Sequence, residues 1–598
     1  MTALRTDGTV IDKQALLRKY QAERAKRLRP DGLTQYVRLT GLDDPYTPRT
    51  ERPPKTDHRT VVFIGGGLAG LMNGARLKEA GVADVRIIEK GGDFGGAWYW
   101  NRYPGAQCDT ASFIYLPLLE ETGYMPTEKY AHGPEILEHC QRIGKHYGLY
   151  DDALFHTEVT GLDWDGTRSR WIIRTDRGDT LTAQFVAMGV GPLHVPKLPG
   201  IPGIGDFAGH SFHTCRWDYD YTGGDPLGAP MSNLADKRVA VIGTGATAIQ
   251  CVPHLARACR ELYVFQRTPS SVDVRANSRT DPDWFAGIAT PGWQQRWMEN
   301  WAAHLLGGTA DDDLVQDNWT AVARRIRSRI AAMAPRDRDG AAIAAAYEDA
   351  EFEKMEEIRA RVDTVIHDPH TAGKLKAWYR QLCKRPCFHD EYLQAYNRPN
   401  THLVDTDGQG VQRVTAAGVV VAGREYQVDC VIYASGFEVG THFTSRAGFD
   451  LTGRDGARLS GYWEQGMRTL HGIHVHGFPN AFLIQGPQGA NMLFNFPHDL
   501  SESAKTIAAV VKHAVDGGFA EVEVTQQAQD AWVKLLLSES GFGKPLAGCT
   551  PGYYNYEGQD PGPWGRLRVG YPKGPLAYFR YIDQWRKSGA FTGLEFRP

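Results

Sequence analysis

Short apolar runs alternate with helical patterns near the start of the chain. Residues 60–64 (T-V-V-F-I) form a continuous apolar run that ends at three glycines, which is typical of a buried parallel strand. Residues 71–79 then show helical spacing with Gly81 behind them, and residues 85–89 form the next apolar run. This order predicts a strand–turn–helix–strand unit.

The same order recurs later in the chain. Residues 238–242 (R-V-A-V-I) are followed by a glycine turn, a helix through Leu255 and a second apolar run at residues 262–265. An internal repeat of βαβ units is typical of α/β proteins with parallel sheets. We therefore expect an α/β fold with two doubly wound, Rossmann-type dinucleotide-binding domains.

Between about residues 278 and 382 the pattern becomes helical. Residues 319–333 and 341–362 are rich in alanine, arginine and glutamate at helical spacing, which predicts a helical insertion. Strand patterns resume at residues 402–404, 418–421 and 431–434.

The segment before the first strand combines a predicted basic helix with a proline-rich polar run. Residues 12–29 predict a basic helix whose apolar stripe is thin, so we expect it to lie on the body of the protein rather than on a membrane. A proline-rich polar run follows. The predicted division is an N-terminal extension (1–57), a first dinucleotide-binding domain (58–195 and 433–598), a second dinucleotide-binding domain (196–277 and 383–432) and a helical insertion (278–382).

Composition narrows the class of protein. The 598 residues are too many for one ordinary domain, and a formal net charge of −3 provides no basic surface for nucleic acid or an anionic membrane. No run is long and apolar enough to span a bilayer, and residues 1–7 contain no apolar signal segment. We expect a cytoplasmic enzyme, as a monomer, with an oligomer left open.

The nine cysteines predict neither a metal site nor a redox-active pair. No C-x-x-C pair is present, and Cys383 and Cys387, four positions apart, have no second pair beside them. We therefore expect no metal and interpret the cysteines as buried, inert thiols in a reducing compartment.

Two glycine-rich turns, each between an apolar strand and a helix, match dinucleotide fingerprints. The first is G-G-G-L-A-G at residues 65–70, and Glu89 stands about 20 residues on, where an acidic side chain binds a ribose. The second is G-T-G-A-T-A at residues 243–248, and its strand ends in Arg267 and Thr268 without an acid. An arginine there pairs with a 2′-phosphate, which favours NADP over NAD.

Four further stretches accompany the two turns. Residues 207–218 contain F-x-G-x-x-x-H-x-x-x-W, and residues 95–109 fit G-G-x-W-x-x-x-x-Y-P-G-x-x-x-D. Residues 433–437 (Y-A-S-G-F) and 382–386 (L-C-K-R-P) complete the set. Together these stretches resemble the type I Baeyer–Villiger monooxygenases, flavoenzymes that turn ketones into esters or lactones. The long N-terminal segment is similar to that of the cyclopentadecanone and polycyclic ketone monooxygenases.

The resemblance implies FAD and NADPH as cofactors, ketone and dioxygen as reactants, and a flavin C4a-peroxide as the oxidant. It assigns catalysis to Arg385, held by Asp109. The residues implied to bind FAD are Gly65, Gly67, Ala69, Gly70, Glu89, Gly96, Ala97, Trp98, Asp109 and Tyr115. Those implied to bind NADP are Gln107, Thr244, Gly245, Ala246, Thr247, Ala248, Gln250, Arg267, Thr268, Lys384 and Arg385.

The signature residues are interpreted as organisers of the connection between the two domains and of its closing motion, not as acid–base catalysts. These residues are Phe207, Gly209, His213 and Trp217. The C-terminal segment departs from many relatives, which carry a tryptophan against the nicotinamide. Here residues 549–556 read C-T-P-G-Y-Y-N-Y, so a tyrosine could take its place, and the sequence leaves open which one.

Two alternative functions stay open at this point. A flavin monooxygenase that oxidises nitrogen or sulfur has a signature ending in another aromatic residue, so Trp217 and Asp109 disfavour it. A non-catalytic flavin-binding sensor is disfavoured by Arg385 and the NADP fingerprint. The apolar residues Met492, Phe494 and Phe496 suit an apolar ketone, and the N-terminal resemblance implies a bulky, cyclic or macrocyclic one.

Overall fold

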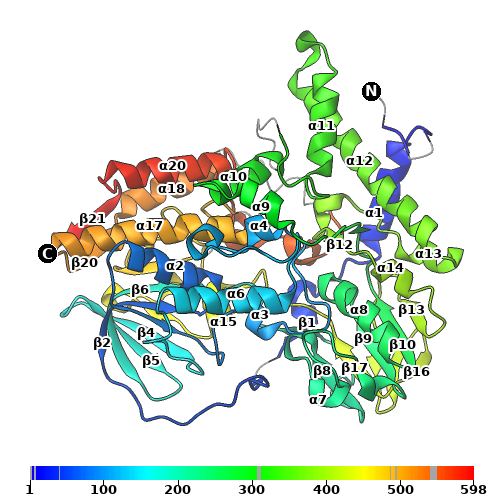
Figure 1. The fold of residues 1–598 in the computed structure, drawn as a ribbon, viewed down its shortest axis with the longest axis horizontal. Helices are drawn as coiled ribbons and strands as arrows, with labels where there is room; N and C mark the ends of the chain where they lie inside the picture. Colours follow the sequence, from blue (N-terminus) through cyan, green and yellow to red (C-terminus); the bar gives the residue numbers. More distant parts are fainter. Residues whose placement is uncertain are drawn as a thin grey trace.

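The computed structural model describes residues 3–5, 8–39, 41–305, 312–484, 486–491, 495–538 and 548–598. Two α/β halves lie side by side, with a group of helices above the second half (Figure 1). Mixed α/β architecture with two parallel-strand units confirms the predicted fold class.

The first sheet is built around β2 (His58–Ile64), which the sequence predicts as a buried strand. β2 runs parallel to β3 (Val85–Ile88) and β6 (Thr180–Met188), so that Ile64 lies opposite both Ile88 and Met188. The strand order is β18-β4-β5-β6-β2-β3, with β19 also paired to β6. The remaining strands are β4 (Val159–Asp165), β5 (Arg170–Thr175), β18 (Leu451–Thr452) and β19 (Ala481–Leu483).

Helices from both ends of the sequence cover this sheet. α2 (Leu68–Glu79) follows the first glycine turn, and α17 (Phe496–Gly517) packs along it (Figure 1). Leu71 and Val511 are fully buried in the core that the two helices share, which anchors the C-terminal segment to the first domain. The other elements here are α3 (Ala97–Trp100), α4 (Ser112–Tyr115), α5 (Leu119–Thr122), α6 (Gly133–His146), α15 (Phe443–Ala447), α16 (Leu459–Tyr462), α18 (Gln526–Ser538), α19 (Gly562–Arg566), α20 (Pro575–Ser588), β20 (Glu521–Val524) and β21 (Leu594–Arg597).

The second sheet has five strands, all parallel, in the order β13-β10-β9-β17-β8. Its central strand β9 (Arg238–Ile242) leads into α8 (Ala246–Ala258), as the repeat of the βαβ pattern predicts. The other strands are β8 (His210–His213), β10 (Glu261–Gln266), β13 (Thr401–Asp405) and β17 (Cys430–Tyr433). An antiparallel ribbon of β14 (Arg413–Val414), β15 (Gly418–Val421) and β16 (Arg424–Gln427) stands beside it, and α7 (Tyr219–Thr222) and α14 (Tyr392–Ala395) also belong to this half.

Between residues 282 and 375 the chain is mainly helical. The helices are α9 (Pro282–Ile288), α10 (Trp293–Leu305), α11 (Ala321–Ala331), α12 (Gly340–Val365) and α13 (Pro369–Leu375). The N-terminal helix α1 (Lys13–Ala25) packs on α12, where the ring of Tyr20 lies 6.2 Å from that of Phe352. α1 therefore lies on the body of the protein, as expected. The domain boundaries themselves remain predictions.

The N-terminal extension is also fastened by a short sheet. β1 (Tyr36–Arg38) pairs antiparallel with β7 (Lys197–Pro199), and Arg38 lies opposite Lys197. This pairing brings the extension to the junction of the two halves. A second small pairing joins β11 (Val272–Asp273) to β12 (Cys387–Phe388).

The interpretation of all nine cysteines as free thiols is wrong for two of them. Cys383 and Cys549 form a disulfide across 166 residues of sequence, while Cys108, Cys140, Cys215, Cys251, Cys259, Cys387 and Cys430 are free and buried. The spacing rules used on the sequence detect only nearby pairs, and this pair is created by the fold. Within the described ranges, no helix is long and apolar enough to cross a membrane, and no group of three or more His, Cys, Asp or Glu residues could hold a metal ion.

Candidate active site

The first glycine turn leaves its backbone free for a phosphate. Gly65 has a left-handed φ of +107°, and a Cβ at Gly70 would collide with the carbonyl oxygen of Gly65. Gly67 caps α2 without any side-chain hydrogen bond, so N–H groups at the helix start remain available to an anion. A Cβ at Gly96 would lie 2.7 Å from Cα of Gly67, so this turn packs backbone to backbone against the start of the 95–109 stretch. These features fit the pyrophosphate of a dinucleotide.

Glu89 lies beneath the same turn. Its carboxylate accepts hydrogen bonds from the N–H groups of Gly66 and Gly91, at 2.6 and 2.7 Å. Burial raises the pKa of Glu89, and the two backbone donors oppose that rise. The acid thus stands at the end of β3 beside the turn, which is where a ribose-binding residue is expected.

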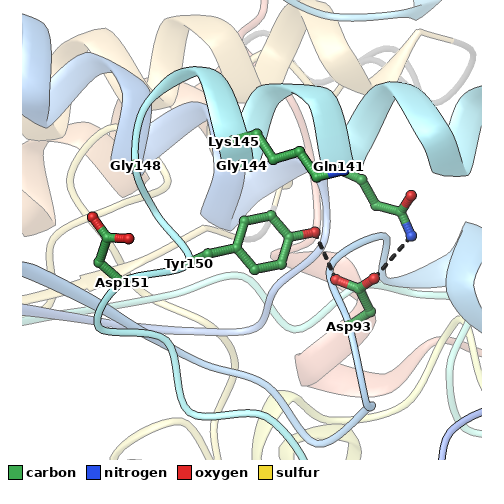
Figure 2. Close-up of a pocket in the computed structure, with 7 residues that line it drawn as sticks. All are labelled: Asp93, Gln141, Gly144, Lys145, Gly148, Tyr150 and Asp151. Carbon is green, nitrogen blue, oxygen red and sulfur yellow. Dashed lines mark hydrogen bonds between the residues drawn. The ribbon is translucent and has the colours of Figure 1, made fainter.

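The segment after Glu89 is held by Asp93, one of seven residues that line a surface hollow of about 420 Å³. Figure 2 shows these seven residues. The Asp93 carboxylate accepts hydrogen bonds from the hydroxyl of Tyr150 (2.7 Å) and from Nε2 of Gln141 (2.8 Å). None of the predicted site residues lines this hollow. We attribute to Asp93 a structural role, fixing the loop that leads to Gly96.

Ala97 and Trp98 begin the short helix α3 directly after Gly96, and Ala69 is buried on α2. The indole Nε1 of Trp98 donates a hydrogen bond to the hydroxyl of Tyr115 at 3.0 Å, and the two rings meet edge to face. Burial raises the pKa of Tyr115 far above its ordinary value, so its phenol stays protonated. This pair forms a rigid aromatic wall beside the first turn.

The second glycine turn has the same construction. Gly243 has φ +121°, and Gly245 caps α8 with no side-chain hydrogen bond, which leaves the N–H groups from Ala246 onward for a phosphate. Thr244 donates its hydroxyl to the carbonyl oxygen of Thr268 (2.7 Å), linking the turn to the end of β10. Thr247 and Ala248 continue the first turn of α8.

Gln107 and Gln250 join the two halves. Nε2 of Gln250 donates to the carbonyl oxygen of Gln107 at 2.7 Å, and Oε1 of Gln250 accepts from the hydroxyl of Tyr103 at 2.8 Å. The side-chain oxygen of Gln107 in turn accepts a hydrogen bond from Arg275, a contact that the sequence analysis missed. The 95–109 stretch is therefore bonded to the helix that follows the second turn.

Arg385 and Asp109 form an ion pair at this junction. Arg385 Nη2 donates to Asp109 Oδ1, and the side chain of Asp109 is 8% exposed while that of Arg385 is 28% exposed. Burial alone would lower the pKa of Arg385, but the Asp109 carboxylate together with Tyr554, Tyr553 and Cys108 outweighs burial, and the pKa lies well above its ordinary value. A permanently charged guanidinium thus lies beside the end of the 95–109 stretch, with part of its surface open.

Two neighbours of this pair could not be found from the sequence. Trp319, from the helical insertion, donates its indole N–H to the carbonyl oxygen of Asp109 at 2.7 Å, and the Arg385 guanidinium lies 5.4 Å from a Trp319 ring centroid. The C-terminal Tyr553 and Tyr554 also interact electrostatically with Arg385. The tyrosines left open by the sequence therefore lie near the cation.

A second group of charges surrounds Arg267, which the sequence predicts as a 2′-phosphate ligand. Arg267 contacts Gln35 Oε1 (2.5 Å), the Tyr36 hydroxyl (3.3 Å) and the Glu557 carboxylate (3.3 Å). Lys384 donates to the carbonyl oxygen of Pro551 at 3.3 Å and lies within electrostatic range of Glu557. Gln35, Tyr36 and Glu557 could not be predicted as neighbours of Arg267 from the sequence, because no local pattern marks them.

The signature residues lie in the second domain. The stretch is not a free connection: His210–His213 is the edge strand β8, and Trp217 is 1% exposed in the core, with its indole donating to Thr222. His213 accepts from the N–H of Cys215 and meets the ring of Phe437 edge to face at 5.7 Å, where the chain crosses back to the first domain. Phe207 is half-buried, and a Cβ at Gly209 would lie 2.7 Å from the Asp429 carbonyl oxygen. Their role as a hinge remains a prediction.

Of the apolar residues expected to line a substrate pocket, only Phe496 can be placed, at the start of α17. Met492 and Phe494 lie outside the described residues.

The family described as pyridine nucleotide-disulphide oxidoreductase matches residues 62–284. Two curated relatives match nearly the whole chain. Neopentalenolactone D synthase of Streptomyces avermitilis is 49% identical over 98% of this chain and 100% of its own length. A Baeyer–Villiger monooxygenase of Streptomyces coelicolor is 47% identical over 96% of this chain and 95% of its own.

Solved structures agree with these relatives. The polycyclic ketone monooxygenase of Thermothelomyces thermophila superposes with a TM-score of 0.90 at 38% identity, covering 98% of each chain. OTEMO in complex with FAD and NADP superposes with a TM-score of 0.72 at 26% identity, covering 91% of this chain and 100% of its own. With two glycine-rich dinucleotide turns, the Arg385–Asp109 ion pair and relatives of this identity along nearly its full length, the chain belongs to the Baeyer–Villiger monooxygenases.

Proposed function

We propose that this protein oxidises a bulky, polycyclic or macrocyclic ketone to an ester or lactone, with FAD bound at the first glycine turn and NADPH at the second. The Arg385–Asp109 ion pair, at the end of the stretch that packs on the first turn and bonds to Gln250 after the second, is the observation that carries the proposal. The polycyclic ketone monooxygenase structure and the lactone synthases among the relatives support the substrate class. Family membership sets aside oxidation of nitrogen or sulfur and a sensor role as the main function.

The cofactors supply the redox chemistry, since NADPH provides the hydride and FAD, when bound, activates dioxygen. The chain's residues bind and orient these groups. The uncapped N–H groups of α2 and α8 would hold the two pyrophosphates, and Glu89 would accept a hydrogen bond from a ribose hydroxyl. Trp98 and Tyr115 wall the flavin pocket and exclude water.

Arg385 is the proposed catalytic residue. Addition of a peroxide nucleophile to a ketone carbonyl places negative charge on the former carbonyl oxygen. One carbon substituent then migrates to the attached peroxide oxygen as the O–O bond breaks and the distal oxygen departs, which leaves an ester or lactone. The fixed guanidinium of Arg385 stabilises that negative charge and stays protonated throughout. Asp109 is a positioning residue: it orients the guanidinium, and Trp319 holds the Asp109 backbone in turn.

A panel of ketones tests this function. Purified, FAD-loaded protein is mixed with NADPH in air and with cyclohexanone, cyclopentadecanone or a tricyclic ketone, and the products are analysed by mass. A true substrate accelerates NADPH oxidation and gains one oxygen as an ester or lactone. An equal rate with and without every ketone, or oxygenation only of an amine or thioether included in the panel, would contradict the proposal.

We also propose that the enzyme is a cytoplasmic monomer. The near-neutral formal charge of −3 provides no strongly charged surface for a partner. Light scattering checks the oligomeric state: a monomer has a mass of 66.4 kDa, and a stable dimer would contradict the proposal.

A further inference from the structure

Glu557 is a buried acid inside a cluster of cations. Its side chain is 3% exposed, and its carboxylate lies 3.3 Å from Arg267 Nη2 and 3.9 Å from Lys197 Nζ. Lys384 is the third cation within electrostatic range. We call these four residues the 557 cluster. With all groups ionised, it has three positive charges and one negative charge.

The 557 cluster resembles a phosphate-binding site in which the Glu557 carboxylate already neutralises part of the positive charge. Thr268, directly after Arg267, is 8% exposed, and its hydroxyl is buried without a hydrogen-bond partner. A buried hydroxyl without a partner, on the residue that follows Arg267, is costly unless a ligand satisfies it. A phosphate monoester, with a charge of roughly −1.5 to −2 at neutral pH, would balance the surplus. Of the nucleotide's phosphates, only the 2′-phosphate is expected at the end of β10.

The loop that carries Glu557 is held in an unfavourable backbone conformation. Tyr556 and Glu557 have consecutive left-handed φ angles of +53° and +56°, although neither is glycine. Such residues persist where surrounding contacts impose them, and they gather at ligand clamps and switch regions. The contact here is with the N-terminal extension, where Gln559 Nε2 donates to the Arg29 carbonyl oxygen at 2.7 Å. Both ends of the chain therefore enclose the 557 cluster.

We propose that the Glu557 carboxylate is an internal competitor for the 2′-phosphate of NADPH and so sets coenzyme affinity and the preference for NADP over NAD. This inference rests on the proposed function, since the subsite belongs to NADPH. In the free protein Glu557 pairs with Arg267 and Lys197. When the coenzyme binds, its 2′-phosphate pairs with these cations and accepts a hydrogen bond from the Thr268 hydroxyl. The loop that carries Glu557 then moves away from the cations.

The test compares two fragments of the coenzyme that differ only in the 2′-phosphate. Adenosine 2′,5′-bisphosphate and adenosine 5′-monophosphate are titrated calorimetrically into the FAD-loaded, full-length protein. Glu557→Gln removes the competing charge but keeps the side-chain length. It is expected to bind the bisphosphate about tenfold more tightly, equivalent to about 1.4 kcal/mol, with unchanged affinity for the monophosphate.

Two variants control for general effects of charge and shape. Asp560→Asn removes an exposed carboxylate three residues further along, which pairs with Arg566 outside the 557 cluster, and should leave both affinities at the wild-type value. Glu557→Asp keeps the charge and should retain most of the competition. Unchanged or weaker binding of the bisphosphate by Glu557→Gln, or equal tightening by Asp560→Asn, would overturn the proposal.

A measurement on the unmodified protein guards against misfolding of the variants. Hydrogen–deuterium exchange of residues 549–559 should increase on addition of the bisphosphate and stay constant with the monophosphate. Slower exchange would mean that the loop closes onto the phosphate, contrary to the proposal. If the protein oxidises ketones but Glu557→Gln does not change the affinity for the bisphosphate, only this inference is refuted. If the affinities change as predicted but no ketone is oxidised, only the proposed function is refuted.

Discussion

The guanidinium of Arg385 donates a hydrogen bond to the carboxylate of Asp109, which lies 276 positions earlier in the chain. Asp109 ends the stretch that packs on the first glycine turn, and Arg385 precedes β12, beside the second domain. The pair therefore fixes one positive charge where the 95–109 stretch meets the segment that precedes β12.

Replacing either partner should impair ketone oxidation without loss of FAD. Asp109→Asn frees the guanidinium and is expected to lower kcat by about 10²-fold, and Arg385→Ala by at least as much, because the charge on the reacting oxygen loses its stabilisation. Oxygen should then be released as hydrogen peroxide while NADPH oxidation continues. The measurement is ester formed per NADPH consumed, with flavin absorbance as the control for bound FAD.

Arg385→Lys separates charge from geometry. If catalysis depends on the planar guanidinium oriented by Asp109, Arg385→Lys should recover only a minor part of the kcat lost in Arg385→Ala. The KM for ketone should stay nearly unchanged. Full activity of Asp109→Asn would show that Asp109 has no positioning role.

Binding of the 2′-phosphate should weaken above about pH 8. Burial lowers the pKa of Lys384 and of Lys197 to about 8, and Glu557 opposes this in both cases. Each lysine is charged below that pH and loses its proton as the pH rises through it. The 2′-phosphate is a dianion above its own pKa of about 6, so affinity should be greatest between about pH 6 and 8 and then fall.

We would measure the dissociation constants of adenosine 2′,5′-bisphosphate and adenosine 5′-monophosphate from acid to alkaline pH. Their ratio isolates the effect of lysine deprotonation on binding of the 2′-phosphate. Other charges near the lysines are already paired: Arg38 with Glu438, and Arg27 with Glu23. Lys384→Arg should move the alkaline decline to higher pH, since arginine does not titrate there. A ratio that stays constant through pH 10 would contradict the assignment.

The Cys383–Cys549 disulfide predicts a defined thiol count. Titration of the denatured protein should find seven free thiols before reduction and nine afterwards. Because the bond closes a long loop, its loss should lower the free energy of unfolding by about 2–4 kcal/mol. A thermal melt with and without reductant measures this change.

The double variant Cys383→Ala/Cys549→Ala is the matched control. It should melt at the temperature of the reduced wild type and show no further response to reductant. Nine thiols in the protein as isolated without reductant would show that the bond does not form.

His213→Ala should slow turnover but retain FAD. Burial lowers the pKa of His213 to about 4, so the ring is neutral at working pH and acts through contacts with Cys215 and Phe437 rather than as a titrating acid. The pH profile of the variant should therefore keep the wild-type shape while its amplitude falls. His210→Ala, three residues earlier on the same edge strand, serves as the control. Wild-type turnover by His213→Ala would exclude a necessary role.

The sequence by itself determined the local parts of this protein. The strand at Arg238–Ile242 and the helices after both glycine turns follow from apolar runs and glycine spacing, because these patterns act over a few neighbouring residues. The likeness of four short stretches to one family also indicated Arg385 and Asp109 as partners.

Only the tertiary structure decided which distant segments meet. The Cys383–Cys549 bond, the indole of Trp319 on Asp109, and Glu557 among the cations join positions that no periodicity connects. Residues 210–213 of the signature stretch likewise form an edge strand. The sequence could not predict this, because the strand pairs with β17, which begins far along the chain at Cys430. Such contacts depend on how whole domains and both chain ends pack together, whereas the sequence patterns describe only each segment's own preference for helix, strand or turn.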